Sequence, residues 1–296
     1  MIVYESCPNC GNANISFVLS AKDYTVSGEV FEIWECSNCT LRFTQNVPGS
    51  EEIGKYYQSE NYISHSDTTK GFINNLYHKV RKRTLVQKRK LIIKTTGKSA
   101  GNILDLGCGT GAFLAAMQEA NWQCSGVEPD KNARKKAGEL YGLQVKEAGE
   151  FYNFPPKNFD AITLWHVLEH VHQLHSYIHQ LRNLLAPGGK IFIAVPNYTS
   201  GDEKIYNECW AAYDVPRHLY HFSPKSMEEL LKPHGLKIEK MKPMWYDSIY
   251  VSMLSEQYKT GNQHPVRALI NGTVSNLQAV FDHKKCSSLI YIISSK

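Results

Sequence analysis

The chain has 296 residues, of which 42% are hydrophobic and 21% charged. These proportions are typical of a globular protein with one large domain and an appendage, or with two domains. No apolar stretch reaches the roughly 18 residues that a transmembrane helix needs. The opening MIVYESCPNC lacks a basic segment followed by an apolar core, which argues against a signal peptide. We therefore expect no membrane span and a cytoplasmic location.

The net charge is +5, and much of the excess lies in one segment. A solvated helix face is the favoured interpretation of this cluster. The alternative is a patch that binds a phosphate-bearing substrate or a nucleic acid. The overall charge balance does not by itself indicate a nucleic-acid partner. The basic residues are Lys79, Arg81, Lys82, Arg83, Lys88, Arg89 and Lys90.

Two C-x-x-C pairs lie near the start of the chain, Cys7/Cys10 and Cys36/Cys39. In a cytosolic protein such pairs indicate metal binding rather than disulfides. Two C-x-x-C turns can supply the four thiolates of a tetrahedral zinc site, with no coordination position left open for catalysis. We therefore predict a structural zinc ion in a small β zinc-ribbon-like domain over residues 1–45. Redox pairs are the weaker alternative, and the ribbon could also contact a partner or cover the substrate.

The organisation changes twice after the ribbon. Residues 46–98 form a tyrosine-rich linker followed by a basic helix, expected over 72–95. From 99 to 296 strands and helices alternate, with a long irregular insertion at about 197–222. The alternation predicts an α/β fold, a Rossmann-like, doubly wound, seven-stranded and mostly parallel sheet. The expected strands are NILDL, CSGVEP, LQVKE, FDAITLW, KIFIAVP, LKIEKMKPMWY and SSLIYII.

The stretch ILDLGCGTGAF joins a strand to a helix through Gly107, Gly109 and Gly111. Glycines allow a tight turn and a close approach of the backbone to a ligand, and the helix start adds unpaired N–H groups. Glu128 ends the next strand, where a carboxylate can accept both hydroxyls of a ribose. The spacing also fits a dinucleotide fingerprint, with Ala112 as the third small residue. At this point a nicotinamide dehydrogenase remains a competing hypothesis.

Four segments favour another family. LDLGCGTG, GVEPD, FDAITLWHVLEHV and LRNLLAPGGKIFIAVPN resemble class I S-adenosylmethionine-dependent methyltransferases, from about residue 70 to the C-terminus. The end of the fourth strand and the L-x-P-G-G turn are features that a dehydrogenase does not need. The resemblance implies the Rossmann-like fold, a methyl-transfer activity and S-adenosylmethionine as the methyl donor.

The resemblance also implies a set of donor contacts. Asp105 and the glycine backbone would hold the amino acid and ribose, and Glu128 the ribose hydroxyls. The adenine would lie beside Pro129 and Asp130, with its edge near Gly149 and Glu150. The full set is Asp105, Gly107, Cys108, Gly109, Gly111, Glu128, Pro129, Asp130, Gly149, Glu150, Trp165 and His166.

HVLEH, at residues 166–170, matches the H-x-x-E-H zinc signature of inverted zincin peptidases. A zincin needs this motif within a longer helix, with a further acidic ligand. Here it follows the fourth strand, so we interpret the match as chance. The resemblance makes His166 a donor or substrate contact and a candidate catalytic residue. Glu169 and His170 are expected to orient the backbone or pack.

The loop after the fifth strand is where the resemblance implies the acceptor site. Asp214, Arg217 and His218 could fix a polar acceptor, and His218 is the candidate general base. Arg217 is alternatively a ligand for a carboxylate or phosphate. The competing interpretation is a structural network in which Asp214 pairs with Arg217. The candidate substrate-binding residues are Tyr198, Trp210, Asp214, Arg217 and His218.

We therefore expect methyl transfer to a small or carrier-linked metabolite, with oxygen favoured and carbon or nitrogen left open. The order of ribbon and core is similar to sugar C-methyltransferases, whose chains are longer. One alternative is RNA methylation, although the fourth strand lacks an N-P-P-Y or D-P-P-Y turn. Another is a zinc-ribbon interaction module that binds the donor without turnover. The acceptor, the atom methylated and the oligomeric state remain open.

Overall fold

The computed structural model describes residues 1–58 and 72–296, with the backbone alone for 72–82. Part of the predicted tyrosine-rich linker and the side chains of Lys79, Arg81 and Lys82 therefore lie outside the described residues. The first helix begins at Phe72 and ends at Thr96, close to its predicted range of 72–95.

Eleven strands and eight α-helices are present in the described part of the chain. The strands are β1 (Ile15–Lys22), β2 (Val30–Cys36), β3 (Arg42–Thr44), β4 (Asn102–Leu106), β5 (Gln123–Val127), β6 (Val145–Lys146), β7 (Phe159–Trp165), β8 (Leu185–Pro196), β9 (Tyr220–His221), β10 (Leu236–Pro243) and β11 (Ser288–Ser295). The helices are α1 (Phe72–Thr96), α2 (Ala112–Gln118), α3 (Lys131–Tyr141), α4 (Leu174–Leu184), α5 (Gly201–Tyr206), α6 (Pro224–Leu231), α7 (Asp247–Thr260) and α8 (Pro265–Phe281).

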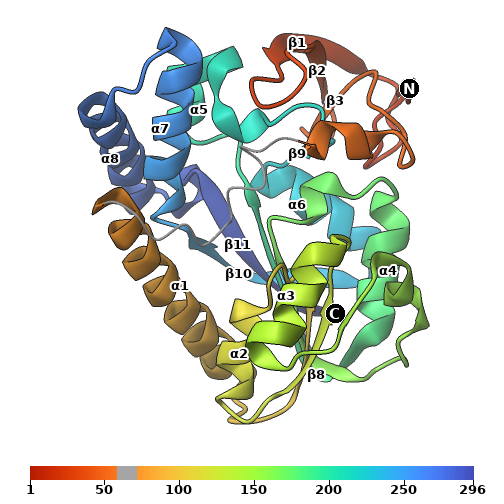
Figure 1. Ribbon diagram of the computed structural model, residues 1–296. Helices are drawn as coiled ribbons and strands as arrows, with labels where there is room; N and C mark the ends of the chain where they lie inside the picture. The colour runs from red at the N-terminus through yellow and green to blue at the C-terminus, as the bar shows by residue number, and fades with distance from the viewer. Residues whose placement is uncertain (59–71) are drawn as a thin grey trace. The chain divides into compact units, whose positions relative to one another are not determined.

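The larger sheet has seven strands in the order β10-β11-β8-β7-β4-β5-β6 (Figure 1). The chain runs from β4 outward to β5 and β6, then returns to β7 on the other side of β4. The pairs β4–β5, β4–β7 and β5–β6 are parallel. This is the predicted doubly wound α/β fold, and the prediction is confirmed. Its switch point lies between β4 and β7, where such sheets bind ligands at the carboxyl ends of their strands.

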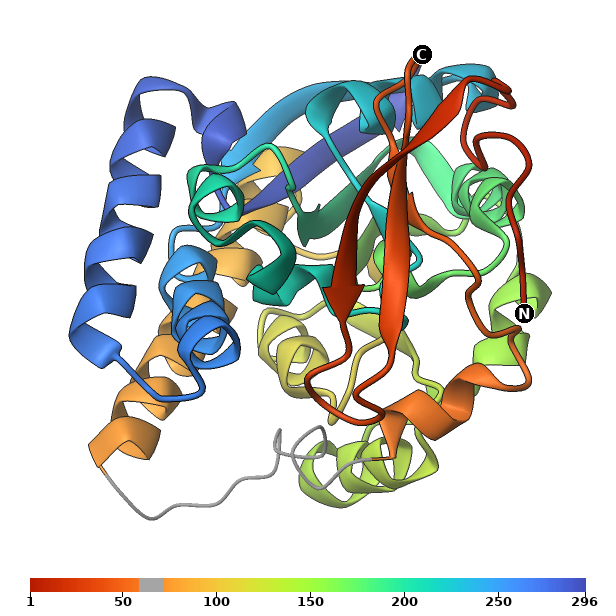
Figure 2. The same cartoon turned by 90° about the horizontal axis from the view of Figure 1, so that it is seen from above.

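The smaller sheet is antiparallel and has the order β1-β2-β3-β9. β1 and β2 run side by side as a long hairpin (Figure 2). β3 pairs with β9, so the N-terminal sheet takes one strand from the predicted insertion at 197–222. The domain boundaries expected from the sequence at 45 and 98 stay a prediction.

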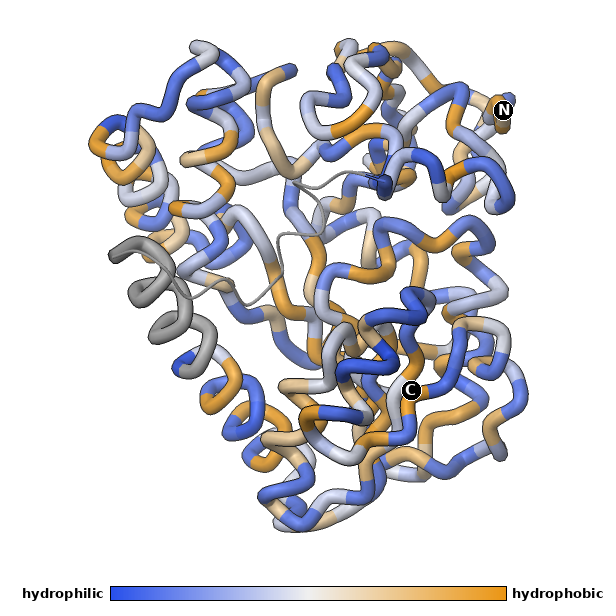
Figure 3. Tube along the Cα trace, viewed as in Figure 1, coloured by the Kyte–Doolittle hydropathy of each residue, from blue (hydrophilic) through white to orange (hydrophobic). Residues whose placement is uncertain are grey.

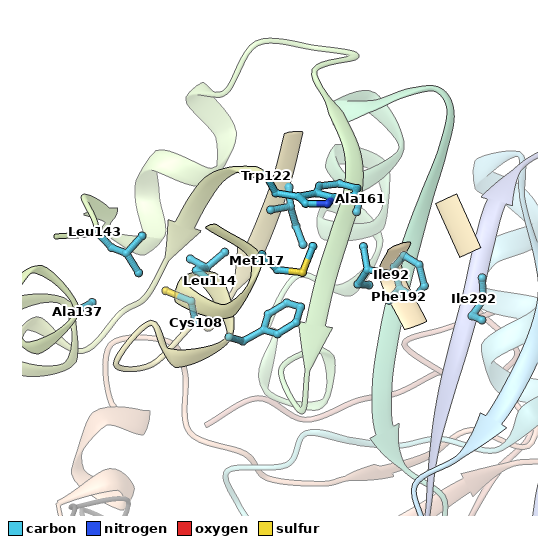
Figure 4. Packing of buried hydrophobic residues seen from close by; sticks show 12 residues of the cluster. Ile92, Cys108, Leu114, Met117, Trp122, Ala137, Leu143, Ala161, Phe192 and Ile292 are labelled. Atoms are coloured by element: carbon cyan, nitrogen blue, oxygen red, sulfur yellow. The ribbon is translucent and has the colours of Figure 1, made fainter. Parts of the chain in front are cut away.

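The described residues divide into two compact units. Residues 1–58, 166–178 and 194–291 form one unit, and 72–165, 179–193 and 292–296 form the other. The second unit has a core between α1, α2 and the strands of the large sheet (Figure 4). Met117, Trp122 and Phe192 are almost completely buried there. This core fixes the start of α2, and with it the glycine turn that precedes the helix.

The first unit has a core of its own, rich in aromatic side chains. Phe31 and Ile33 of β2 pack there with Tyr206, Trp210 and Tyr213, which come from the insertion after β8. These side chains are all almost completely buried. The insertion is therefore a packed part of this unit.

Between β10 and β11 the chain forms α7 and α8, which the sequence analysis did not predict. The buried positions of these helices are mostly small or polar residues, such as Ser252, Ser255 and Gly272. Large apolar residues occupy other faces, so the usual helical pattern of buried apolar positions is missing. None of the helices in the described ranges combines the length and apolar character needed to cross a membrane.

Candidate functional site

The four cysteines of the predicted zinc site lie together. One sulfur atom from each is within 4.8 Å of the others. The Sγ atoms of Cys7 and Cys39 are 3.5 Å apart, and those of Cys10 and Cys36 are 3.6 Å apart. Four thiolates at about 2.3 Å from one zinc ion would be separated by roughly 3.8 Å. The cluster therefore fits a structural zinc ion.

Amide groups surround these sulfur atoms. The backbone N–H of Asn9 donates to Cys7 Sγ at 3.4 Å, and its side-chain amide lies 3.5 Å from Cys39 Sγ. The Asn38 amide lies 3.6 Å from Cys10 Sγ. Such donors stabilise thiolate charge and orient metal ligands. The sequence indicated the ligands, while these supporting contacts depend on the folded turns.

The glycine turn has the backbone conformation that its sequence predicted. Gly107, Gly109 and Gly111 all have positive φ angles, of 66°, 54° and 81°. A Cβ atom on Gly111 would lie 2.7 Å from Leu143 Cδ1, so close packing also requires a glycine there. At Gly109 a Cβ would meet no heavy atom within 4 Å. The backbone at Gly109 therefore borders open space that a ligand could occupy.

Glu128 is buried beside this turn. One carboxylate oxygen accepts the backbone N–H of Gly109 at 2.8 Å, and the other accepts that of Asp130 at 2.9 Å. Burial raises the pKa of Glu128, and the two backbone donors oppose that rise. The carboxylate is thus fixed in orientation, and each oxygen retains a lone pair for a hydroxyl group.

Asp105, at the end of β4, is also buried. The Thr163 hydroxyl on the neighbouring strand β7 donates to its Oδ1 at 2.6 Å. Burial raises the pKa of Asp105 to about 7, although the bond from Thr163 and the charge of Lys88 favour ionisation. A nearby positive charge would stabilise the carboxylate further.

The other predicted donor contacts surround the same turn. Cys108 is buried, whereas Pro129, Asp130 and Gly149 are exposed. Asp130 caps α3 by accepting the N–H of Ala133. The half-buried Glu150 accepts from the Asn153 amide at 3.2 Å. The loop positions after β5 and β6 are therefore open to a ligand.

Trp165 ends β7 and packs edge-on against Phe113, with 5.6 Å between ring centroids. The Lys88 ammonium lies 4.1 Å from the centroid of the Trp165 ring, a cation–π contact. The Trp165 indole N–H is buried with no acceptor among the described residues. A buried donor of this kind usually has a partner, which a ligand could provide.

His166 follows Trp165 directly and has a left-handed backbone, with φ of 59°. Its Nδ1 lies 3.3 Å from Glu169 Oε1, and its Nε2 lies 3.1 Å from Asp247 Oδ2. Burial would lower the pKa of His166, but the two carboxylates raise it to about 10. His166 is therefore an imidazolium at neutral pH, held in a conformation that non-glycine residues seldom adopt.

His170 and His218 lie next to one another, with ring centroids 4.7 Å apart. Each presents Nδ1 to a backbone carbonyl, Arg217 O at 3.0 Å for His170 and Ala212 O at 2.8 Å for His218. Because a carbonyl only accepts, each of these bonds needs a proton on Nδ1, so that Nε2 carries the lone pair whenever the ring is neutral. His218 Nε2 lies 3.9 Å from Asp214 Oδ2. Burial and the charge of His218 lower the pKa of His170 to about 4.

Glu169, His170 and His218 each place one potential ligand atom within 4.8 Å of the other two. Glu169 is fully buried, and its ion pair within the described part of the chain is with His166. This group could hold a cation, or it could surround the hydroxyl group of a substrate.

Most of the remaining predicted substrate residues form ion pairs or hydrogen bonds with other residues of the protein. Arg217 is buried between Asp214, at 2.7 Å, and Asp23, at 2.9 Å. Trp210 is buried and donates its indole N–H to Asp202. Tyr198 is also buried and donates to Thr40 O. Asp214, Arg217 and Trp210 line one cavity, together with Tyr24 and Tyr258. The predicted contact of these residues with substrate stays a prediction.

Asp247 and Thr163 belong to these contacts although no sequence motif indicated them. Asp247 pairs with His166, Thr163 with Asp105, and Tyr57 OH lies 3.0 Å from His170 Nδ1. Each partner is distant in sequence, and no local motif relates the members of these pairs.

Comparison with known proteins supports the same family as the sequence motifs. A family model described as a methyltransferase domain matches residues 77–241, more than half of the chain. The chain is 28% identical over 166 residues to the mitochondrial ubiquinone biosynthesis O-methyltransferase of Rattus norvegicus. That match covers 50% of this chain and 48% of the rat protein. A ubiquinone biosynthesis O-methyltransferase of Xanthomonas euvesicatoria is 26% identical over 162 residues, covering 50% of this chain and 68% of that protein.

A solved structure is similar in fold. Phosphoethanolamine N-methyltransferase 2 of Haemonchus contortus, in complex with S-adenosyl-L-methionine, has a TM-score of 0.52 and 19% identity. The match covers 86% of this chain and 61% of that chain. The chain therefore belongs to the methyltransferase domain family, and it is a class I S-adenosylmethionine-dependent methyltransferase with a cysteine cluster suited to structural zinc.

Proposed function

We propose that the protein transfers the methyl group of S-adenosylmethionine to a hydroxyl oxygen of a small or carrier-linked metabolite. The proposal includes the cytoplasmic location expected from the sequence. The named relatives from rat and Xanthomonas are O-methyltransferases, which supports an oxygen acceptor. The observation that carries the proposal is the His218 ring, whose Nδ1–H is committed to Ala212 O. Its Nε2 can therefore take a proton from a hydroxyl group.

The donor residues are proposed from the geometry of the glycine turn. The open space at Gly109 admits the adenosyl group, and Glu128 accepts the ribose hydroxyls. Asp105 balances the positive charge of the donor. The indole N–H of Trp165 is a candidate partner for the donor's carboxylate. Pro129, Asp130, Gly149 and Glu150 would border the adenine.

Methyl transfer to oxygen is an in-line displacement that also removes the hydroxyl proton. Positioning supplies much of the rate, and a general base adds typically 10²- to 10⁴-fold. Asp214, 3.9 Å from His218 Nε2, would stabilise the imidazolium that forms when His218 takes that proton. Arg217 holds Asp214 by three hydrogen bonds. We therefore assign Asp214 and Arg217 as positioning residues for His218.

The other two histidines are less suited to the role of base. His166 is already protonated at neutral pH, because two carboxylates raise its pKa to about 10. The pKa of His170 is lowered to about 4, which makes it a weak base. Trp165 and His166 are consecutive, so their Cα atoms are about 3.8 Å apart. We propose that His166 orients Glu169 and fixes the backbone after the donor-binding strand.

The test uses labelled donor with a panel of small hydroxyl, amine and activated-carbon acceptors. We expect label transfer to a hydroxyl acceptor and a roughly 10²- to 10⁴-fold loss of turnover in His218→Ala. Donor affinity, measured by calorimetry, should stay unchanged. His283→Ala is the matched control, because His283 also presents Nδ1 to a backbone carbonyl, Ala279 O, at the surface. Methylation of amines or carbon alone, or full turnover by His218→Ala, would contradict the proposal.

A further inference from the structure

The helices α7 and α8 form a second feature of the first unit, separate from the histidine cluster. They follow one another through residues 261–264 and lie side by side (Figure 2). Both lie outside residues 77–241, which the family model matches. The function of this pair is therefore not explained by the methyltransferase core.

Small residues occupy much of the buried sides of these two helices. Ser248, Ser252 and Ser255 are buried on α7, and Gly272 and Ser275 are buried on α8. A Cβ atom on Gly272 would lie 2.9 Å from the Cα atom of Ile249, so the backbones approach closely. This packing places little apolar area between the helices and leaves their large side chains on other faces.

The large apolar side chains of α8 lie on its exposed face. Their exposed fractions range from 41% for Val274 to 91% for Phe281. From one helical turn to the next, these residues are three or four positions apart. Their side chains therefore lie along one face over the whole length of α8. Apolar residues recur along α8 in Figure 3. The members of this stripe, called the α8 face below, are Val266, Leu269, Ile270, Val274, Leu277, Val280 and Phe281.

The charges of α8 favour a protein rather than a lipid partner. Arg267 is its one charged residue, and it lies 3.4 Å from Glu256 of α7. A helix that lies on a membrane surface usually carries several lysines or arginines on its polar side. The side of α8 opposite the α8 face is instead buried in the protein and made of small residues. The α8 face therefore resembles the apolar centre of a protein–protein interface.

We propose that the α8 face binds a second copy of this chain. The seven side chains expose on the order of 800 Å², about the area that each partner contributes to an interface of standard size. Monomeric proteins seldom carry apolar patches larger than roughly 300–600 Å². A stripe that covers a whole helix can pair with itself across a two-fold axis, the commonest symmetry of homo-oligomers.

The two-fold axis also predicts the register of the two helices. The stripe runs from Val266 to Phe281, and its midpoint lies between Thr273 and Val274. Antiparallel packing about that midpoint places Val274 near its own copy. It also places Ile270 against the partner's Leu277. This pairing is specific enough to be tested by charge exchange and by crosslinking.

The first experiment measures mass by sedimentation equilibrium at micromolar concentrations. We expect twice the chain mass of 33.6 kDa for the wild-type protein, and the monomer mass for Leu277→Asp. Burying two aspartates should weaken the dimer by roughly a hundredfold or more. Leu140→Asp on α3 is a matched control, because Leu140 and Leu277 are both 56% exposed. A monomeric wild-type protein, or a dimer that Leu277→Asp leaves intact, would overturn the proposal.

The second experiment tests the register and excludes a misfolded variant. Ile270→Glu and Leu277→Lys should each dissociate the dimer, and the double variant should restore it in part, because each glutamate then faces a lysine of the other copy. Val274→Cys should crosslink to the dimer mass with a short bismaleimide, whereas the wild-type protein should not. No recovery in the double variant, or no crosslink, would refute this pairing. Flotation of a monomeric wild-type protein with anionic phosphatidylglycerol vesicles would assign the α8 face to a membrane instead.

Discussion

His166 lies between two carboxylates, with Nδ1 3.3 Å from Glu169 and Nε2 3.1 Å from Asp247. Glu169 comes from the turn that follows β7, whereas Asp247 is the first residue of α7. The histidine therefore fixes the start of α7 relative to the turn after β7, within one compact unit. Since both ring nitrogens face carboxylates, the two ion pairs are stable only while the imidazole ring is doubly protonated.

This arrangement predicts a loss of stability at alkaline pH. The folded pKa of His166 is about 10, above its ordinary value of 6.5. A raised pKa stabilises the fold fully below the unfolded value, and this contribution is lost as pH rises through about 10. His166 is 34% exposed, so solvent screening limits the effect to about 1 kcal/mol. Denaturant unfolding should show His166→Gln less stable at pH 6 and equal to wild type above pH 10. An unchanged difference across that range would contradict the ion-pair assignment.

The second prediction concerns the donor site. Glu128→Gln should weaken S-adenosylmethionine binding by roughly 10- to 100-fold, because an amide cannot accept two backbone N–H groups and two ribose hydroxyls together. Both backbone bonds to Glu128 are present in the structure. Glu139→Gln on α3 is the control, and donor affinity should change by no more than about threefold, since the Glu139 carboxylate is exposed and pairs with Lys135 at 3.6 Å. Calorimetric affinities that fall equally in both variants would refute the special role of Glu128.

Local sequence patterns predicted the parts of the molecule that depend on neighbouring residues. The glycine turn needs positive φ angles at 107, 109 and 111, and the two C-x-x-C turns gather four thiolates. Strands rich in apolar residues, alternating with helices, likewise predicted the doubly wound sheet. In each case the residues that determine the local structure lie within one short segment of the sequence.

Other features depend on contacts that no local pattern records. Asp247 and His166 are 81 residues apart, so their pairing exists only in the folded chain. Arg217 was expected to face a substrate or to pair with Asp214, but the sequence could not show its further partner Asp23. The helices α7 and α8 were missed because serine and glycine occupy their buried positions. The large apolar residues of α8 lie on its exposed face, which reverses the pattern that predicts a surface helix.

The third prediction tests the zinc site. Cys36→Ser should lower the zinc content from about one ion per chain to none, measured by atomic emission after dialysis. Loss of the ion should also lower Tm by roughly 10 °C or more, because structural zinc contributes directly to folding. Cys124→Ser is the control, since Cys124 is outside the cluster and its thiol lies 3.4 Å from Leu114 O. Full zinc retention in Cys36→Ser would contradict the four-thiolate site.

The last prediction concerns the ion pair that anchors the acceptor loop. Asp23 accepts from Arg217 at 2.9 Å and from the backbone N–H and hydroxyl of Ser27. Burial opposes ionisation, but these donors outweigh it and lower the pKa of Asp23. Asp23→Asn removes one of the two carboxylates that pair with the buried Arg217 guanidinium. We therefore expect the free energy of unfolding to fall by about 3 kcal/mol at pH 7.

The pH dependence separates this effect from a simple packing defect. A lowered carboxyl pKa stabilises the fold above the unfolded value of 3.8, and the benefit is lost as pH falls through the folded value. The difference between wild type and Asp23→Asn should therefore shrink below about pH 4. Asp130→Asn, at an exposed helix cap, should cost about 0.5 kcal/mol or less. Because Arg217 also holds Asp214 near His218, Asp23→Asn should lower turnover while donor affinity stays unchanged. Turnover equal to that of the wild-type protein would show that the Asp23–Arg217 ion pair does not position His218.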